Sequence, residues 1–263
     1  MARLLSGITL AALSAGVIVW STPFAFFVFI AVFVTAGLFE YFHMLKSAGE
    51  PALPVVGIVA GFAVFSGVSL GGAIGALSFT PLVFIGVMGW ATLFHDGASY
   101  KTASNTLFGA FYIGLTLSQL VLVRHMADGV MLVLLLAFAN TFCDSLAYYT
   151  GKTFGKTPLA PTISPKKTVE GFAGGLIGAV LTSVAFAHFF MPGFALGHAV
   201  AVGLIAGFAG PMGDLAESSL KRRMGVKDSG SIIPGHGGAL DRIDSWLFTA
   251  PVFYVYLRFV VGA

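Results

Sequence analysis

The stretch GDLAESSLKRRMGVKDSGSIIPGHGGALDRIDS (residues 213–245) decides how the chain is interpreted, because it concentrates charge in a chain that has little. Only 10% of the 263 residues are charged, yet acidic and basic side chains recur throughout this stretch. One long apolar run precedes it and another follows. Charge held between membrane-length segments is costly to place, so it indicates a functional site. Its carboxylates suit a hard divalent cation, and its lysines and arginines suit phosphate.

The composition around this stretch predicts an all-α, polytopic integral membrane protein. Hydrophobic residues make up 57% of the chain, with 26 Phe, and the mean hydropathy is +0.93. Several runs approach the roughly 20 residues that cross a bilayer as a helix. A transmembrane barrel would show weak alternation instead. We expect about nine transmembrane helices, near residues 5–22, 23–45, 53–72, 77–95, 104–124, 129–150, 168–191, 194–213 and 241–261.

The distribution of positive charge predicts the orientation. With the N-terminus inside and the C-terminus outside, all but Arg124 and Arg258 of the 14 Lys and Arg face the cytoplasm. We expect scaffold helices over residues 1–130 and a catalytic region over 131–263, within one integrated membrane domain. Cytoplasmic loops would cover 151–167 and 214–240. The apolar N-terminal run resembles a signal peptide, but we interpret it as a retained first helix.

The net charge and the cysteine count argue against a nucleic-acid-binding protein, a disulfide-linked protein and a cysteine-based zinc protein. The net charge of +3 fits the inside-facing loops, and no nucleic-acid motif is present, so we expect no nucleic-acid partner. A single cysteine, Cys143, excludes an intrachain disulfide and a cysteine-based zinc site. We expect it to be a packed thiol in a helix.

Two pairs of acids have a spacing that suits a magnesium site. Asp214 and Glu217 are three residues apart, as are Asp241 and Asp244, so each pair shares one side of a helix. Mg²⁺ takes one or two carboxylates and completes its shell with phosphates and water. The alternative is salt bridging within the segment, such as Glu217 to Lys221.

Basic residues beside these acids would hold phosphates. The alternative for Lys221, Arg222, Arg223 and Lys227 is charge that only sets topology. A second cluster lies upstream at residues 144–171, which contain Asp144 and the segment SPKKTVEG. There Ser164 or Thr168 could cap a helix whose N-terminus favours anions, while the glycine-flanked His236 downstream suggests contact with substrate.

The segment from Ser218 to Asp244 resembles the signature of the phosphatidate cytidylyltransferases. The resemblance lies in its Lys221-Arg222 pair, Lys227-Asp228, Ile233-Pro234, His236-Gly237-Gly238 and Asp241-Arg242-Ile243-Asp244. Residues 140–246 carry the resemblance; Ala239 departs mildly, where the family has a larger aliphatic residue. The resemblance implies a Mg²⁺ enzyme that makes CDP-diacylglycerol and pyrophosphate from CTP and phosphatidic acid. It also implies that K⁺ assists and that the protein is a homodimer.

The resemblance, together with the chemistry above, gives the candidate site residues. Catalytic roles are expected for Asp214, Asp241, Lys221 and His236, with Asp214 and Asp241 binding the metal and Glu217 and Asp244 as further candidates. Substrate binding is expected from Asp144, Lys166, Lys167, Glu170, Ser218, Arg222, Lys227, Asp228, Gly237, Gly238 and Arg242.

Three other functions remain open. A CTP-dependent kinase of a lipid alcohol would release CDP. A transporter would place its acids near helix centres, whereas these lie at predicted helix ends. An inactive scaffold is the third. We favour the transferase, in the bacterial inner membrane with its site on the cytoplasmic side; the choice of cytosine rests on the resemblance alone.

Overall fold

The computed structural model describes residues 2–94, 99–230 and 237–262, and nearly all of them are helical. The first half contains α1 (Ala2–Trp20), α2 (Pro23–Ser47), α3 (Pro54–Phe94), α4 (Ser99–Gly109), the π-helix η1 (Ala110–Leu115) and α5 (Thr116–Arg124). The second half contains α6 (Gly129–Phe154), β1 (Pro158–Ala160), β2 (Ser164–Thr168), α7 (Val169–Phe190), α8 (Leu196–Arg223), α9 (Leu240–Tyr256) and the π-helix η2 (Leu257–Val261).

The lengths and surfaces of these helices make the chain an integral membrane protein. Six helical segments among the described residues are long and apolar enough to cross a bilayer. Large apolar side chains cover their outer surfaces; Leu77 and Ile74 are each 78% exposed. Water would penalise so much exposed apolar surface, whereas lipid would not. The predicted fold class is confirmed, while the count of nine helices and the orientation stay predictions.

Helix α3 is a hairpin of two spans. Its 41 residues would extend about 60 Å as a straight helix, twice the thickness of a bilayer core. Gly72 has a φ of 56° and a ψ of −134°, outside the helical region. A Cβ on Gly75 would collide with the carbonyl oxygen of Gly67, which would be about 12 Å away along a continuous helix. The chain therefore reverses at Gly72, between the predicted spans 53–72 and 77–95.

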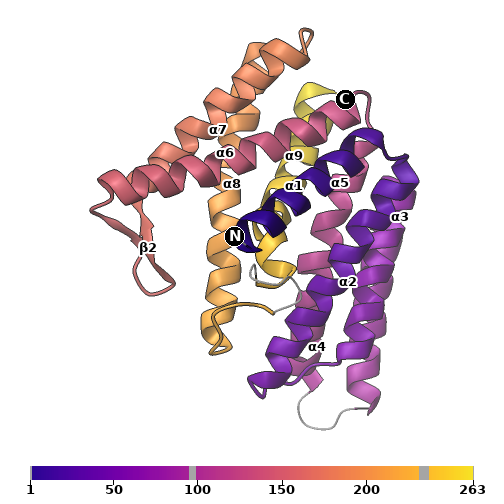
Figure 1. Ribbon diagram of the computed structural model, residues 1–263. Helices are drawn as coiled ribbons and strands as arrows, with labels where there is room; N and C mark the ends of the chain where they lie inside the picture. The colour runs from indigo at the N-terminus through magenta and orange to yellow at the C-terminus, as the bar shows by residue number, and fades with distance from the viewer. Residues whose placement is uncertain (1, 95–98, 231–236, 263) are drawn as a thin grey trace. The chain divides into compact units, whose positions relative to one another are not determined.

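The chain forms two compact units. Unit 1 comprises Met1–Leu122 and Arg223–Ile243. In it, α2, α3 and α4 pack side by side (Figure 1) around buried side chains such as Leu38, Phe65 and Ile113. Part of the signature stretch thus packs with helices that we expected to be scaffold. The predicted division at residue 130 stays a prediction.

Unit 2 comprises Val123–Arg222 and Asp244–Ala263. Its α6 and α7 run side by side (Figure 1), because glycines on α7 admit α6 closely. A Cβ on Gly175 would lie 2.9 Å from the carbonyl oxygen of Cys143, and one on Gly178 would collide with Leu146. Small residues at such spacing typically let two helices pack closely, and Cys143 is a buried free thiol, as predicted.

Two local features differ from the prediction. Helix α8 continues to Arg223, beyond its expected end at residue 213, because Glu217 and Lys221 form an i,i+4 ion pair that suits a helix. The expected loop 151–167 instead contains the end of α6 and an antiparallel hairpin of β1 and β2. These strands are too short to give a recognisable alternating pattern.

Candidate active site

The acid Asp214 lies on α8 and is held at both carboxylate oxygens. The Nζ atom of Lys167 lies 2.5 Å from Oδ2, and the Ser218 hydroxyl donates to Oδ1 at 3.2 Å. Ser218 is one helical turn after Asp214, and Lys167 is on strand β2. Its neighbour Lys166 is exposed. Two predicted site segments, SPKKTVEG and the start of the signature, therefore meet within unit 2.

Asp144 on α6 and Asp244 on α9 lie within electrostatic reach of Asp214. Three helices thus bring negative charge to one place, with Lys167 and Lys221 as the cations that act on it. Like charges so placed disfavour one another and favour a bound cation. The chemistry of this donor set fits a hard divalent ion.

Glu217 and Lys221 form a buried ion pair on α8. The Lys221 Nζ atom lies 2.5 Å from Glu217 Oε2; the side chain of Glu217 is fully buried, and that of Lys221 is 10% exposed. The salt bridge left open by the sequence is therefore present. It does not exclude a role for Lys221 in phosphate binding, since Lys221 also acts electrostatically on Asp244.

Asp241 is in unit 1, at the start of α9. Its Oδ2 atom accepts hydrogen bonds from the Ser229 amide at 3.1 Å, the Ser229 hydroxyl at 2.9 Å and the Gly238 amide at 2.8 Å. Gly237 has a φ of 80°, which glycine adopts without strain. Ser229 and Gly238 thus direct three hydrogen-bond donors at one oxygen of the Asp241 carboxylate.

Asp214 and Asp241 belong to different compact units, so their predicted pairing on one metal ion stays a prediction. Within the described ranges, no group of three or more His, Cys, Asp or Glu side chains has the arrangement of a metal cage. Mg²⁺ rarely uses such a cage, because it keeps several waters and substrate oxygens. The two aspartates therefore remain its candidate ligands, with Glu217 and Asp244 as the further ones.

Glu170 stabilises the hairpin. Its carboxylate accepts hydrogen bonds from the amides of Lys156 and Thr157 and from the Thr157 hydroxyl, at 3.0–3.2 Å. Thr168 caps α7 by accepting from the Gly171 amide at 3.1 Å, so it is the cap, where Ser164 was the alternative. These contacts fix the strand that carries Lys167.

Four of the other predicted site residues lie at the surface of the described part of the chain. Arg222, Lys227, Asp228 and Arg242 are exposed. His236 lies outside the described residues. A role in substrate binding for each of these stays a prediction.

Two residues of the site, Glu40 and Ser229, were missed by the sequence analysis, and Ser229 contacts Asp241 directly. Glu40 on α2 accepts hydrogen bonds from Ser229 and from the first residues of α9. A local signal for it existed, because it is the one acid in the 25-residue apolar segment Pro23–Ser47.

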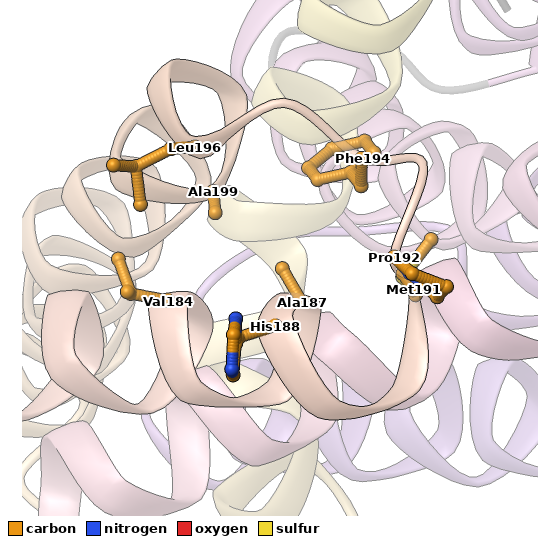
Figure 2. Close-up of a pocket in the computed structure, with 8 residues that line it drawn as sticks. All are labelled: Val184, Ala187, His188, Met191, Pro192, Phe194, Leu196 and Ala199. Atoms are coloured by element: carbon orange, nitrogen blue, oxygen red, sulfur yellow. The ribbon is translucent and has the colours of Figure 1, made fainter.

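A cavity of about 280 Å³ opens where α7 ends and α8 begins (Figure 2). Val184 and His188 line one side, and Phe194 and Leu196 line the other. Leu196 precedes Asp214 by 18 residues, about 27 Å along α8. The cavity is therefore separate from the carboxylate cluster.

Comparison with known proteins gives the family. The model of the Cytidylyltransferase family matches residues 1–260. The chain is 44% identical over 135 residues to the uncharacterized protein YnbB of Escherichia coli, covering 51% of this chain and 45% of that protein. It is 41% identical over 149 residues to the phosphatidate cytidylyltransferase of Bacillus subtilis, covering 56% of this chain and 55% of the relative.

A phosphatidate cytidylyltransferase of Staphylococcus saprophyticus is 37% identical over 180 residues, covering 68% of each chain. The chain spans about half the length of several relatives that it matches, including the first two named here. Because the family's model covers almost every residue, the chain belongs to the cytidylyltransferase family.

Proposed function

We propose that this chain transfers CMP from CTP to phosphatidic acid, giving CDP-diacylglycerol and pyrophosphate, and that it depends on Mg²⁺. The observation that carries the proposal is the cluster in unit 2, where Asp144, Asp214 and Asp244 lie within electrostatic reach of one another and of Lys167 and Lys221, in a chain with membrane-length helices. The names of the Bacillus and Staphylococcus relatives support the substrate pair.

The reaction requires little acid–base chemistry from the protein. The phosphate of phosphatidic acid is a monoester whose second pKa is near 6, so it is already anionic at neutral pH. One of its oxygens bonds to the α-phosphorus of CTP. The bond from that phosphorus to the bridging oxygen breaks, and pyrophosphate leaves with the electron pair. The main barrier is the approach of two polyanions.

The charged residues of the cluster would reduce the repulsion between the two polyanions. Lys167 and Lys221 would bind phosphate oxygens, with Lys166, Arg222, Lys227 and Arg242 as further cations on the path of the substrates. Prearranged charge stabilises the charge that develops in phosphoryl-type transfers. Asp214 and Asp241 would hold Mg²⁺, which when bound offsets negative charge on the triphosphate. When substrate arrives, the Lys167 ammonium would leave the Asp214 carboxylate and bind a phosphate oxygen.

The cellular setting is also proposed. The excess of Lys and Arg in the predicted inside loops supports a site at the cytoplasmic face, where CTP is available and phosphatidic acid lies in the leaflet. A bacterial cytoplasmic membrane, which is the inner membrane where a second membrane exists, fits the bacterial relatives. Assistance by K⁺ and a homodimeric state are extended from the family resemblance, as is the preference for CTP.

The test is a pair of assays on the full chain in liposomes, with CTP radiolabelled at either the α- or the γ-phosphate. We expect α-label to enter lipid when phosphatidic acid is the acceptor, with γ-label released as pyrophosphate. Diacylglycerol, which carries a hydroxyl in place of the phosphate, is the matched control acceptor and should receive no label. Entry of γ-label into lipid with release of CDP would identify a kinase and overturn the proposal.

A further inference from the structure

Glu40 is a buried acid in a membrane-length helix. It lies near the C-terminal end of α2, and only 2% of the residue is exposed. An ionised carboxylate in such a place is costly unless hydrogen-bond donors surround it. The identity of those donors therefore indicates what the residue does.

Two of the donors are the backbone amides at the start of α9. The Ala239 amide donates to Oε1 at 2.9 Å, and the Leu240 amide donates to Oε2 at 2.8 Å. The first amides of a helix lack partners within that helix, and its N-terminus favours negative charge. Glu40 thus caps α9 from a helix about 200 positions earlier in the chain.

The third donor connects Glu40 to the candidate metal ligand. The Ser229 hydroxyl lies 3.0 Å from Glu40 Oε2 and 2.9 Å from Asp241 Oδ2. One hydroxyl thus bridges two carboxylates, and its single proton can be donated to one of them at a time. The position of Asp241 is therefore tied to that of Glu40 through Ser229 and through the helix turn on which Asp241 lies.

The glycines of the signature fit around this carboxylate. A Cβ on Gly230 would lie 2.5 Å from Glu40 Oε1, and one on Gly238 would collide with Glu40 Oε2 and with the Ser229 hydroxyl. The absence of side chains at these two positions is thus explained by the approach of Glu40, with no need for a substrate there. All of these residues belong to unit 1.

We propose that Glu40 is a positioning residue, which sets the first turn of α9 and, through Ser229, the orientation of Asp241 for metal binding. The inference rests on the proposed function only in taking Asp241 as a metal ligand. Residues that hydrogen-bond a metal ligand typically change metal affinity or activity by about 10–100-fold when replaced. Ser229 belongs to this group, because it hydrogen-bonds Asp241, and Glu40 acts one hydrogen bond further out, by holding Ser229 and the first turn of α9.

The test measures metal binding without catalysis. Mn²⁺ is titrated into the purified full chain in detergent and followed by electron paramagnetic resonance. In Glu40→Gln an NH₂ group replaces one oxygen and faces a donor, so we expect Mn²⁺ affinity to fall about 10–100-fold. In the transferase assay, the Mg²⁺ concentration for half-maximal rate should rise by a similar factor, and high Mg²⁺ should restore the rate.

The matched control is Glu50→Gln. Glu50 is also in unit 1, but its partner is Lys101, 2.8 Å away near the surface. The hydrogen bond with Lys101 holds the pKa of Glu50 below its usual value, so Glu50 is charged at neutral pH. We expect this variant to bind Mn²⁺ with wild-type affinity.

A second variant separates positioning from folding. Ser229→Ala keeps both amide bonds to Glu40 and removes only the bridging hydroxyl, so the protein should fold even if Glu40→Gln does not. Because this hydroxyl hydrogen-bonds Asp241 directly, we expect the Mn²⁺ affinity of the variant to fall about 10–100-fold. Wild-type Mn²⁺ affinity in Ser229→Ala and in folded Glu40→Gln would overturn the proposal, as would a wild-type protein that binds no Mn²⁺. If the wild type binds Mn²⁺ and Glu40→Gln weakens it, but no CMP is transferred, the positioning role stands and the proposed reaction fails.

Discussion

Replacing Lys221 tests whether the ion pair on α8 is structural, catalytic or both. At 2.5 Å and an effective dielectric of about 20, the attraction between Lys221 and Glu217 is about 7 kcal/mol before desolvation is subtracted. Removal of one partner from a buried pair typically costs about 3–5 kcal/mol. In Lys221→Met, the fully buried Glu217 loses its ammonium, and the carboxylate cluster with Asp244 loses a cation. We expect a cost at the upper end of that range.

Glu217→Gln should cost less, because Lys221 keeps Asp244 within electrostatic reach. The double variant Glu217→Gln/Lys221→Met leaves no buried charge from the pair, so it should recover most of the lost stability. Thermal melting of the detergent-solubilised chain measures these effects. At about 2–4 °C per kcal/mol, a loss of about 4–5 kcal/mol in Lys221→Met lowers the melting temperature by about 8–20 °C.

Activity separates the two roles of Lys221. If Lys221 binds phosphate, the double variant will be stable but will transfer no CMP, whereas Glu217→Gln, which keeps the Lys221 ammonium, will lose less activity than the double variant. Recovery of activity in the double variant would refute the phosphate role. A melting temperature of Lys221→Met close to that of the wild type would refute the argument from burial.

Lys167→Met removes the ammonium that holds Asp214 Oδ2, so we expect kcat/KM for CTP to fall about 10–100-fold. The loss should be smaller in Lys166→Met, because Lys166 is exposed. Equal losses of kcat/KM in steady-state assays would contradict the placement of Lys167 at the site. Gly175→Ala places a Cβ 2.9 Å from the Cys143 carbonyl oxygen, so melting should show a loss of about 1–3 kcal/mol. Gly193→Ala, with open space around its Cβ, is the control, and an equal loss there would count against close packing of α6 and α7.

Much of the fold could be predicted because its signals are local. Apolar runs mark the spans, glycines at small-xxx-small spacing mark the α6–α7 contact, and Gly72 lies at the end of one of two adjacent predicted spans. The threonine-proline pair Thr22-Pro23 starts α2, since Thr22 accepts a hydrogen bond from the Ala25 amide and proline suits the first helical turn.

The candidate site was only partly predictable, because its contacts join distant segments. The sequence indicates Lys167 and Asp214 as site residues separately, and only the packing of unit 2 shows that they form an ion pair. Glu40 and Ser229 are 189 positions apart, so no window of sequence reveals their hydrogen bond. The end of α8 was missed because hydropathy falls at Asp214, although the helix continues with its charged residues paired along it.

The central claim is that Asp214 and Asp241 hold the metal for CMP transfer to phosphatidic acid. The most direct test measures transfer of α-labelled CMP as a function of Mg²⁺ concentration in Asp214→Asn and Asp241→Asn. The control is Asp128→Asn, which makes the same chemical change at an exposed left-handed turn position that asparagine tolerates.

We expect both site variants to lose transfer at every Mg²⁺ concentration, and the Asp128 variant to match the wild type. Transfer at the wild-type rate and Mg²⁺ dependence in either site variant would contradict the account.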